Sequence, residues 1–199
     1  MKTFLIVVSS ILTVASVVPY MIEVLRGKTK PRIVSWFTWS LLTGIACAAS
    51  FADKQYPTAI LMLFATIETG TIVVLGLRHG DHKLEWFDIV CQIAALIGLA
   101  LWQIFDSPSI AVISAVSIDL IGALPTIKHS WDKPGEETAL TFFLAGLGGL
   151  CTVLVAGSWR ITAIAYPLYL LFINLVLAGI ILGRDRRLLQ GEPAELRKL

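Results

Sequence analysis

Charged residues are scarce in this chain. Only 15% of its 199 residues are Asp, Glu, Lys or Arg, whereas 56% are hydrophobic. That balance is too apolar for a soluble domain of this size. Apolar runs of about twenty residues recur along the chain, and that is the length a helix needs to cross a bilayer core about 30 Å thick. The composition therefore predicts an integral membrane protein of the all-α class.

The motifs of the common catalytic classes are also missing. The sequence contains no HExxH, no GxSxG and no phosphate-binding loop, and none of its histidines lies inside an apolar run. The last run, 161–183, has no lysine, which excludes a retinal Schiff base there. We predict that the protein is not an enzyme and has no cofactor. A membrane enzyme that uses Glu68 and Asp119 as acid and base is kept as an alternative.

Cysteine and histidine form neither a disulfide pattern nor a metal pattern. Cys47, Cys91 and Cys151 lie in three different apolar runs without CxxC spacing, and we interpret them as small packing residues. His79 and His82 form an HxxH in a short polar loop, which we interpret as solvated. From these Cys and His patterns we expect no metal. The net charge of +2 comes from basic residues at the ends of the runs, so we also expect no nucleic-acid binding.

Seven apolar runs are long enough to cross a membrane. They cover residues 3–22, 33–52, 55–77, 86–105, 107–127, 138–159 and 161–183. With the N-terminus outside, 13 of the 16 Lys and Arg lie on the inner side, and only Lys2, Lys54 and Arg160 lie outside. The positive-inside rule thus predicts an N-out, C-in topology, with the C-terminus in the cytoplasm and the plasma (inner) membrane as the location.

The chain resembles itself at an offset of 106 residues. The aligned pairs are Pro19 with Pro125, Phe37 with Phe143, Leu41 with Leu147, Ile67 with Ile173 and Arg78 with Arg184. The offset predicts two parallel three-helix repeats, 1–83 and 107–185, joined by a linker helix in 84–106 and followed by a cytoplasmic tail, 186–199. The first span begins like a signal peptide, but we expect it to be retained because the repeat needs it.

The layout and two segments resemble the SWEET, SemiSWEET and PQ-loop transporters. The segments are VPYMIEVLRGKTK and LPTIKHSWDK, each a proline followed by a basic turn, with Pro-Tyr and Pro-Thr where that family has Pro-Gln. The resemblance implies a three-helix unit, a linker helix and a second three-helix unit around a midplane substrate site. It also implies that Glu68 and Asn174 take the places of two asparagines that face each other across the pocket. The resemblance further implies that the family's prolines on the second and sixth spans correspond to Pro31 and Pro134 in this chain.

Three polar residues and two prolines are the main site candidates within the spans. Glu68, Asp119 and Asn174 all lie near the middle of their spans. A carboxylate at that depth costs roughly 2.5–3.5 kcal/mol to insert, so it normally faces a cavity or a partner. We therefore expect a shared polar cavity. Pro19 and Pro125 each remove one helical hydrogen bond at matching positions and are the expected hinges.

The second span supplies the other pocket candidates. Trp39 and Thr43 share one face of this span, and the resemblance implies that an aromatic residue there covers the solute. Thr13 on the first span completes the candidate substrate-binding set. Trp36 and Asp88 lie nearer the inner interface, where we expect them to act as anchors.

The predicted function is transport of a small polar solute, sugar-like or amino-acid-like, by alternating access around a midplane site. The expected partners are the solute, the lipid bilayer and, as a candidate coupling ion, the proton. A homo-oligomer is left open. A non-transporting receptor or assembly factor with the same fold is the alternative, because fold alone does not decide function.

Overall fold

The computed structural model describes residues 2–52, 54, 56–80, 83–102, 108–156 and 159–191. Within these ranges the chain is all-helical, with seven α-helices, one short 3-10 helix and no strand. In chain order they are α1 (Lys2–Leu25), α2 (Ile33–Ala52), α3 (Tyr56–His79), α4 (Trp86–Trp102), α5 (Pro108–Asp132), η1 (Pro134–Glu136), α6 (Ala139–Val155) and α7 (Ile161–Gly191). The all-α prediction is confirmed at this level.

Each helix overlaps one of the predicted spans, but several extend further. α5 continues through Pro125 to Asp132, and α1 continues through Pro19 to Leu25. A proline removes only its own N–H bond, so a helix held by its neighbours continues past it. α7 also contains Pro167, and it runs to Gly191 into the expected tail.

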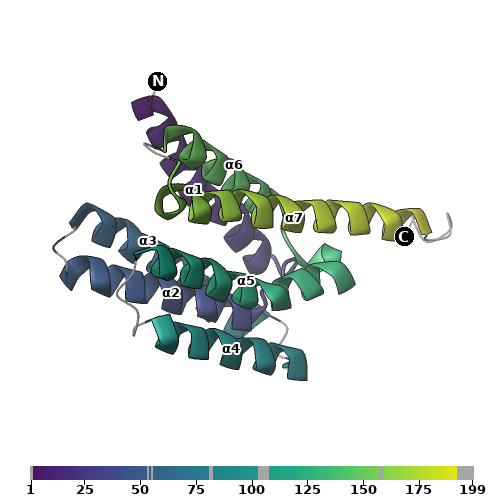
Figure 1. The fold of residues 1–199 in the computed structure, drawn as a ribbon. Helices are drawn as coiled ribbons and strands as arrows, with labels where there is room; N and C mark the ends of the chain where they lie inside the picture. The colour runs from purple at the N-terminus through teal and green to yellow at the C-terminus, as the bar shows by residue number, and fades with distance from the viewer. Residues whose placement is uncertain are drawn as a thin grey trace.

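Six helices pack side by side in a closed ring. Around the ring the order is α1, α3, α2, α5, α7, α6 and back to α1. α4 lies outside the ring, against α5 and α2 (Figure 1). Among the described residues the backbones of α3 and α7 do not approach each other closely, although Ile72 of α3 belongs to the same apolar core as Leu177 of α7. They occupy opposite positions on the ring. Side chains from the two helices can therefore meet only in the centre of the bundle.

The larger apolar core is formed by side chains of α1, α2, α3, α6 and α7. Tyr20, Trp36 and Phe142 are its buried aromatic members, and they pack against Leu177 and Ile181 of α7. A second, smaller core joins α2, α4 and α5. Each core ties helices from the first half of the chain to helices from the second half.

Glycines allow the closest helix approach between α6 and α7. A Cβ at Gly149 would lie 2.9 Å from the Leu171 amide nitrogen and 3.1 Å from the Pro167 carbonyl oxygen. At Gly179 and Gly183 a Cβ would meet nothing within 4 Å. Although Gly179 and Gly183 form a GxxxG pattern, which is typical of helix packing, this face of α7 is left open within the described part of the chain.

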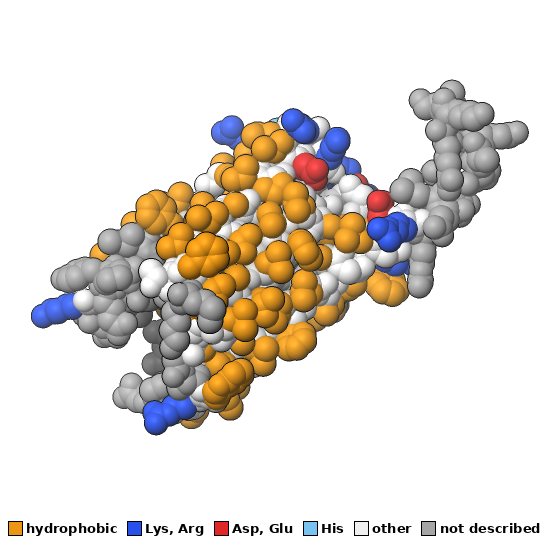
Figure 2. Space-filling model, turned by 90° about the horizontal axis from the view of Figure 1, so that it is seen from above, with side chains coloured by type: hydrophobic (Ala, Val, Ile, Leu, Met, Phe, Trp, Pro, Cys, Tyr) orange, Lys and Arg blue, Asp and Glu red, His pale blue; other side chains and the backbone are white. Residues whose placement is uncertain are grey.

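The outer surface is largely apolar. Large hydrophobic side chains such as Phe4, Phe64, Leu154 and Phe172 are more than half exposed. Hydrophobic atoms cover the middle of the view in Figure 2, and charged atoms gather toward its ends. Three helices, over Thr3–Leu25, Val112–Asp132 and Ala163–Arg186, are long and apolar enough to cross a membrane by length and composition. An exposed apolar surface of this extent fits a lipid environment.

Candidate functional site

A buried carboxylate held by two tyrosines forms the most distinctive polar site. Asp119 lies halfway along α5 and is 6% exposed. Its Oδ2 accepts a 2.6 Å hydrogen bond from the Tyr169 hydroxyl, and its Oδ1 accepts a 3.1 Å bond from the Tyr166 hydroxyl. The two tyrosine rings lie 6.0 Å apart on α7. We call this group, with Trp39, the Asp119 site.

The geometry of α7 explains how both tyrosines reach one carboxylate. Residues three apart in an α-helix lie on the same face, so Tyr166 and Tyr169 both point from α7 toward α5. Pro167 between them has no N–H to give, which frees a carbonyl one turn earlier and favours a local bend. The YPLY sequence thus presents two phenol groups side by side.

Trp39 reaches the same carboxylate from α2. Its indole N–H interacts with the Asp119 carboxylate. The contact does not have the geometry of a hydrogen bond, so the buried Nε1 atom has no hydrogen-bond partner among the described residues. The Trp39 ring meets Trp36 edge-on, with centroids 5.0 Å apart and planes at 88°. One acid and three aromatic side chains from α2, α5 and α7 therefore converge. α2 belongs to the first half of the chain, and α5 and α7 belong to the second half.

The Asp119 site has no positive charge to balance its acid. No ion pair to Asp119 occurs among the described residues, and its two hydrogen-bond donors are neutral hydroxyls. An ionised carboxylate without a cationic partner is costly in an apolar interior. The site must therefore bind a proton or another positive group when it is isolated from water.

The remaining predicted residues are placed differently. Glu68 on α3 is half-buried, and within the described residues its carboxylate has no hydrogen bond or ion pair. The Asn174 amide donates to its own helix, to the Leu170 carbonyl at 2.8 Å. Among the described residues no hydrogen bond joins Glu68 to Asn174, and their helices lie on opposite sides of the ring. The Glu68, Asp119 and Asn174 cavity stays a prediction, and of the three residues only Asp119 is shown bonded to side chains of another helix.

The two threonine candidates add little to this site. The Thr43 hydroxyl donates to the Trp39 and Ser40 carbonyls of its own helix, at 2.9 and 3.2 Å. Thr13 lies within α1, and the position of its side chain is outside the described part of the structure. Of the candidate substrate-binding residues, the structure brings Trp39 and Asp119 together.

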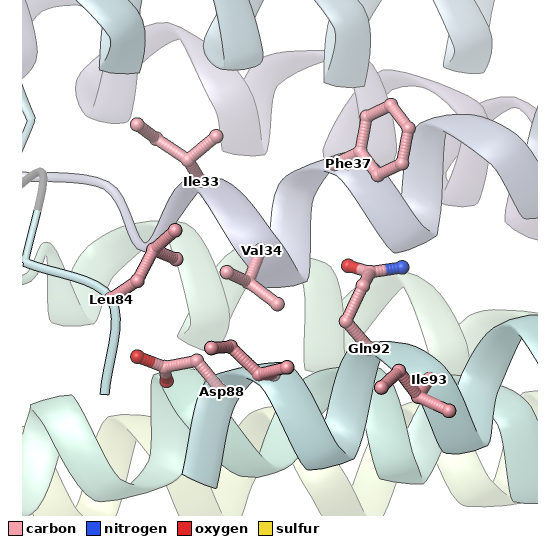
Figure 3. A pocket seen from close by; sticks show the side chains of 8 residues that line it. Ile33, Val34, Phe37, Leu84, Asp88, Gln92 and Ile93 are labelled. Atoms are coloured by element: carbon pink, nitrogen blue, oxygen red, sulfur yellow. The ribbon is translucent and has the colours of Figure 1, made fainter. Parts of the chain in front are cut away.

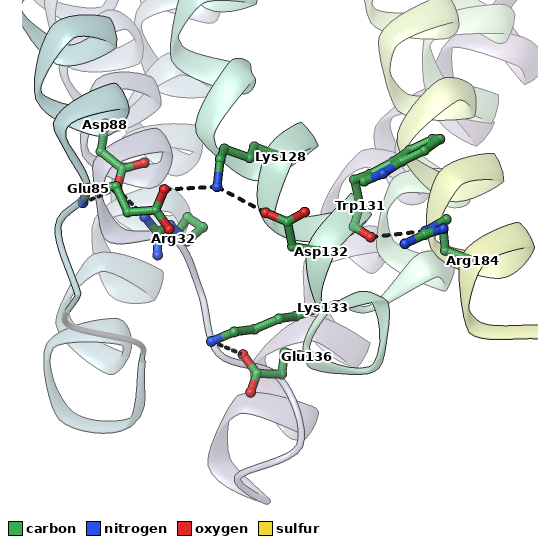
Figure 4. Close-up of polar contacts among 9 residues, drawn as sticks. All are labelled: Arg32, Glu85, Asp88, Lys128, Trp131, Asp132, Lys133, Glu136 and Arg184. Atoms are coloured by element: carbon green, nitrogen blue, oxygen red, sulfur yellow. Dashed lines mark hydrogen bonds and ion pairs between the residues drawn. The ribbon is translucent and has the colours of Figure 1, made fainter. Parts of the chain in front are cut away.

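One end of the bundle is closed by ion pairs; we call it the connector end, formed by residues 26–32, 83–88 and 128–138. Lys30 pairs with Glu136 at 2.6 Å. Lys128 lies between Glu85 and Asp132 at 2.8 and 2.9 Å (Figure 4). The Lys30 pair joins the two chain halves, and the Lys128–Glu85 pair joins α5 to the segment before α4. Most are at least partly exposed and individually weak, so they close the end as a network.

Asp88 and Trp36 differ from the expected interface anchors. Asp88 is 1% exposed and pairs with Arg32, which is also buried. Trp36 is buried too, and its Nε1 donates to the Tyr20 hydroxyl at 3.1 Å. Both predictions were wrong because each side chain is buried with a polar partner inside the bundle: Arg32 from the loop before α2 pairs with Asp88, and Tyr20 of α1 accepts from Trp36.

A second buried acid lies at the connector end. The Tyr20 hydroxyl donates to Glu137 Oε2 at 3.0 Å, whereas Glu137 Oε1 is buried without a partner. Burial raises the pKa of Glu137 from its ordinary 4.5 to about 8, against the opposing effects of the Tyr20 hydrogen bond and the Arg32 charge. Next to it, the Thr29 and Thr138 hydroxyl oxygens lie 2.6 Å apart, and both groups bond to Glu23.

Tyr166, Tyr169 and Glu137 were not identified from the sequence. Two tyrosines three residues apart around Pro167 in an apolar span were an available signal for the first two. Glu137 follows Glu136 in a charged loop, and nothing in the sequence of this loop distinguishes the buried Glu137 from the partly exposed Glu136. Burial of one and not the other depends on how the loop folds.

An apolar groove of about 250 Å³ lies between α2 and α4. Figure 3 shows Ile33, Val34 and Phe37 on one side of it, with Gln92 and Ile93 on the other. Apart from Asp88 and Gln92 its lining is hydrophobic. In the described residues no cluster of His, Cys, Asp or Glu has the three members that a metal site needs. The Asp119 site is therefore the stronger candidate for a polar ligand.

Comparison with known proteins gives no assignment. The chain matches no protein-family model, no curated protein and no solved structure. Its function therefore has to be argued from the residues themselves.

Proposed function

We propose that the chain is a membrane transporter that moves a small polar solute by alternating access around the Asp119 site. The observation that carries the proposal is a buried acid at mid-bundle, surrounded by aromatic side chains from both chain halves. Intramembrane acids are costly and usually mark a solute or ion path. A site assembled from two halves changes when one half moves against the other.

The ring of helices supports a duplicated architecture of two parallel three-helix units. Exchanging α1, α2 and α3 for α5, α6 and α7 maps the order of contacts around the ring onto itself. Positions 106 residues apart also share environments: Phe37 and Phe143 are 43% and 44% exposed, and Tyr20 and Thr126 are both fully buried. The proposed N-out, C-in topology places the connector end in the cytoplasm.

The closed connector end supports one of the two states that alternating access requires. Loops from both halves meet there through Lys30 and Glu136, and through Tyr20 and Glu137. In the proposed mechanism these contacts open when the solute is released on that side. Pro19 and Pro125 lie within helices that lead to this end, where a missing hydrogen bond makes bending easier.

Reconstitution tests the proposal. Purified full-length protein in proteoliposomes is expected to accumulate or exchange at least one member of a panel of radiolabelled sugars, amino acids and amines. Asp119→Asn should abolish that flux, whereas Ser117→Ala, on the exposed face of the same helix, should retain it. A folded protein that moves no solute above the level of empty liposomes would contradict transport and favour the receptor or assembly-factor alternative.

A further inference from the structure

The distribution of charge across the spans restricts the kind of solute that the bundle can hold. None of the sixteen Lys and Arg lies inside any of the seven predicted spans, and none of the three His does. The spans contain three acids, Glu68, Asp88 and Asp119. Asp88 is neutralised by Arg32, which leaves two acids without a basic partner among the described residues.

This imbalance disfavours anionic solutes and gives neutral ones no electrostatic advantage. An anion entering the mid-bundle would meet two carboxylates and no positive side chain, and repulsion in a low-dielectric interior is strong. A neutral sugar could stack on Trp39, but it would leave the charge of Asp119 to be balanced by a proton. A positively charged solute removes the imbalance when it binds.

The arrangement of the aromatic rings fits a cation as well. Trp39, Tyr166 and Tyr169 surround the Asp119 carboxylate. Trp and Tyr attract cations to their faces, with Trp the strongest. Each carboxylate oxygen has a second lone pair beyond the one that a tyrosine uses, and the tyrosine oxygens can accept hydrogen bonds too. An ammonium or guanidinium group can therefore bind without displacing either tyrosine.

From these contacts we infer that the solute carries a positively charged nitrogen, which pairs with Asp119 within the cage of Trp39, Tyr166 and Tyr169. This inference rests on the proposed transport function and names the chemical class of its solute. The positive group is a primary ammonium, a quaternary ammonium or a guanidinium. Asp119 supplies the opposite charge, and the three rings select against a fully hydrated ion.

Matched probes of similar shape and different charge test the inference. The midpoint of thermal unfolding of the purified full chain is measured with arginine against citrulline, and with choline against 3,3-dimethylbutan-1-ol, at constant ionic strength. A ligand that binds the folded state raises the midpoint by mass action. We expect at least one cation to raise it, and its neutral counterpart to have no effect at the same concentration.

Variants separate the site from non-specific effects. Asp119→Asn should weaken binding of the active cation at least tenfold, and Trp39→Phe several-fold, while Ser117→Ala, on the exposed face of the same helix, should bind like the wild type. The wild-type comparison of charged and neutral probes stands even if Asp119→Asn does not fold. Stabilisation by the neutral probes alone, or a response to pH with none to any cation, would overturn the inference.

Flux measurements on the same probes distinguish this inference from the proposed function. Uptake of a neutral solute with no uptake of its charged counterpart would leave transport standing and overturn the cation assignment. Binding of a cation without flux would keep the assignment of the site and overturn transport. Uptake of the cation, inhibited by other cations and lost in Asp119→Asn, would support both.

Discussion

At the scale of single residues, Glu137 shows how position decides the behaviour of a carboxyl group. Its neighbour Glu136 is half-exposed and surrounded by cations, and although burial opposes this, Lys30 and Lys133 hold the pKa of Glu136 below its ordinary value. Glu137, one residue later, is buried beside a phenol, and its pKa is raised to about 8. Adjacent glutamates therefore differ in charge near neutral pH.

Glu137 should make the folded chain less stable as the pH rises. Between pH 4.5 and about 8 the folded state keeps a proton that the unfolded state releases, so its contribution is complete below pH 4.5 and is lost as the pH reaches about 8. At about 1.4 kcal/mol per pKa unit the effect is a few kcal/mol at most. Glu137→Gln, neutral at every pH, should remove this slope in unfolding midpoints measured from pH 5 to 8.5.

Glu136→Gln is the matched control for that measurement. Since the pKa of Glu136 is lowered, its stabilising contribution is present above pH 4.5 and is lost as the pH falls through the lower folded-state value. Its own titration contributes nothing between pH 5 and 8.5, so most of the slope should remain in this variant, with a change only from the loss of its charge beside Glu137 and His129. An identical slope in the wild type and in Glu137→Gln would show that Glu137 is not the group responsible.

The sequence identifies residues that are costly to bury in an apolar run whatever surrounds them. It misses residues whose role depends on which side chain packs against them. Asp119 and Trp39 are recognisable because an acid or a tryptophan inside an apolar run needs an explanation wherever it packs. Tyr166 and Tyr169 are ordinary span residues until α7 is turned toward α5, and that rotation depends on contacts far away in sequence. The Asn174 amide donates to a carbonyl of its own helix, a local bond that the sequence does not indicate, and its place in the pocket stays a prediction.

At the scale of helices, glycine positions distinguish contact faces from open faces. Gly149 lies directly against the backbone of α7, whereas Gly183 faces open space. Both are in GxxxG-like patterns, so the letters alone do not separate them. The helices themselves could be predicted from the apolar runs. Their rotation and their neighbours could not, since leucine, valine and isoleucine serve equally well against lipid and against protein.

Gly149→Ala should therefore destabilise the α6 and α7 pair. The added methyl group would sit 2.9 Å from the Leu171 amide nitrogen, and backbone atoms cannot move aside as a flexible side chain can. Overpacking of this kind costs about 1–3 kcal/mol. The measurement is the unfolding midpoint in detergent, which should fall clearly below that of the wild type.

Gly183→Ala provides the matched control on α7. No atom lies within 4 Å of its added Cβ, and alanine is favoured over glycine inside a helix by up to about 1 kcal/mol. Its unfolding midpoint should equal or slightly exceed that of the wild type. Equal loss of stability in both variants would indicate a general effect of glycine substitution and contradict the packing explanation.

At the scale of the whole molecule, aromatic contacts link the connector end to the Asp119 site. Glu137 bonds to Tyr20, Tyr20 accepts a hydrogen bond from Trp36, and Trp36 packs edge-on against Trp39. Tyr20 follows Pro19 directly in α1. Bending of α1 at this proline would displace Tyr20 and, through the tryptophans, the wall of the Asp119 site. Opening of the end and release of the solute are thus expected to be coupled.

A disulfide across the connector end tests whether this end must open. The Thr29 and Thr138 hydroxyl oxygens are 2.6 Å apart on loops from the two halves, so Thr29→Cys with Thr138→Cys places two sulfurs within reach of a bond. The native Cys47, Cys91 and Cys151 are first replaced by alanine. Oxidised protein should lose most of its flux in proteoliposomes, and dithiothreitol should restore it.

The single-cysteine variants separate locking from simple loss of the threonine hydroxyls. Each single variant lacks one contact of the Thr29, Thr138 and Glu23 group, so any flux that it loses should be the same with and without oxidant. Only the pair should respond to redox conditions, because only the pair covalently joins the two halves. Full flux through the verified disulfide would mean that the connector end does not open during transport, and the solute would then need a route that leaves Tyr20 and Glu137 in place.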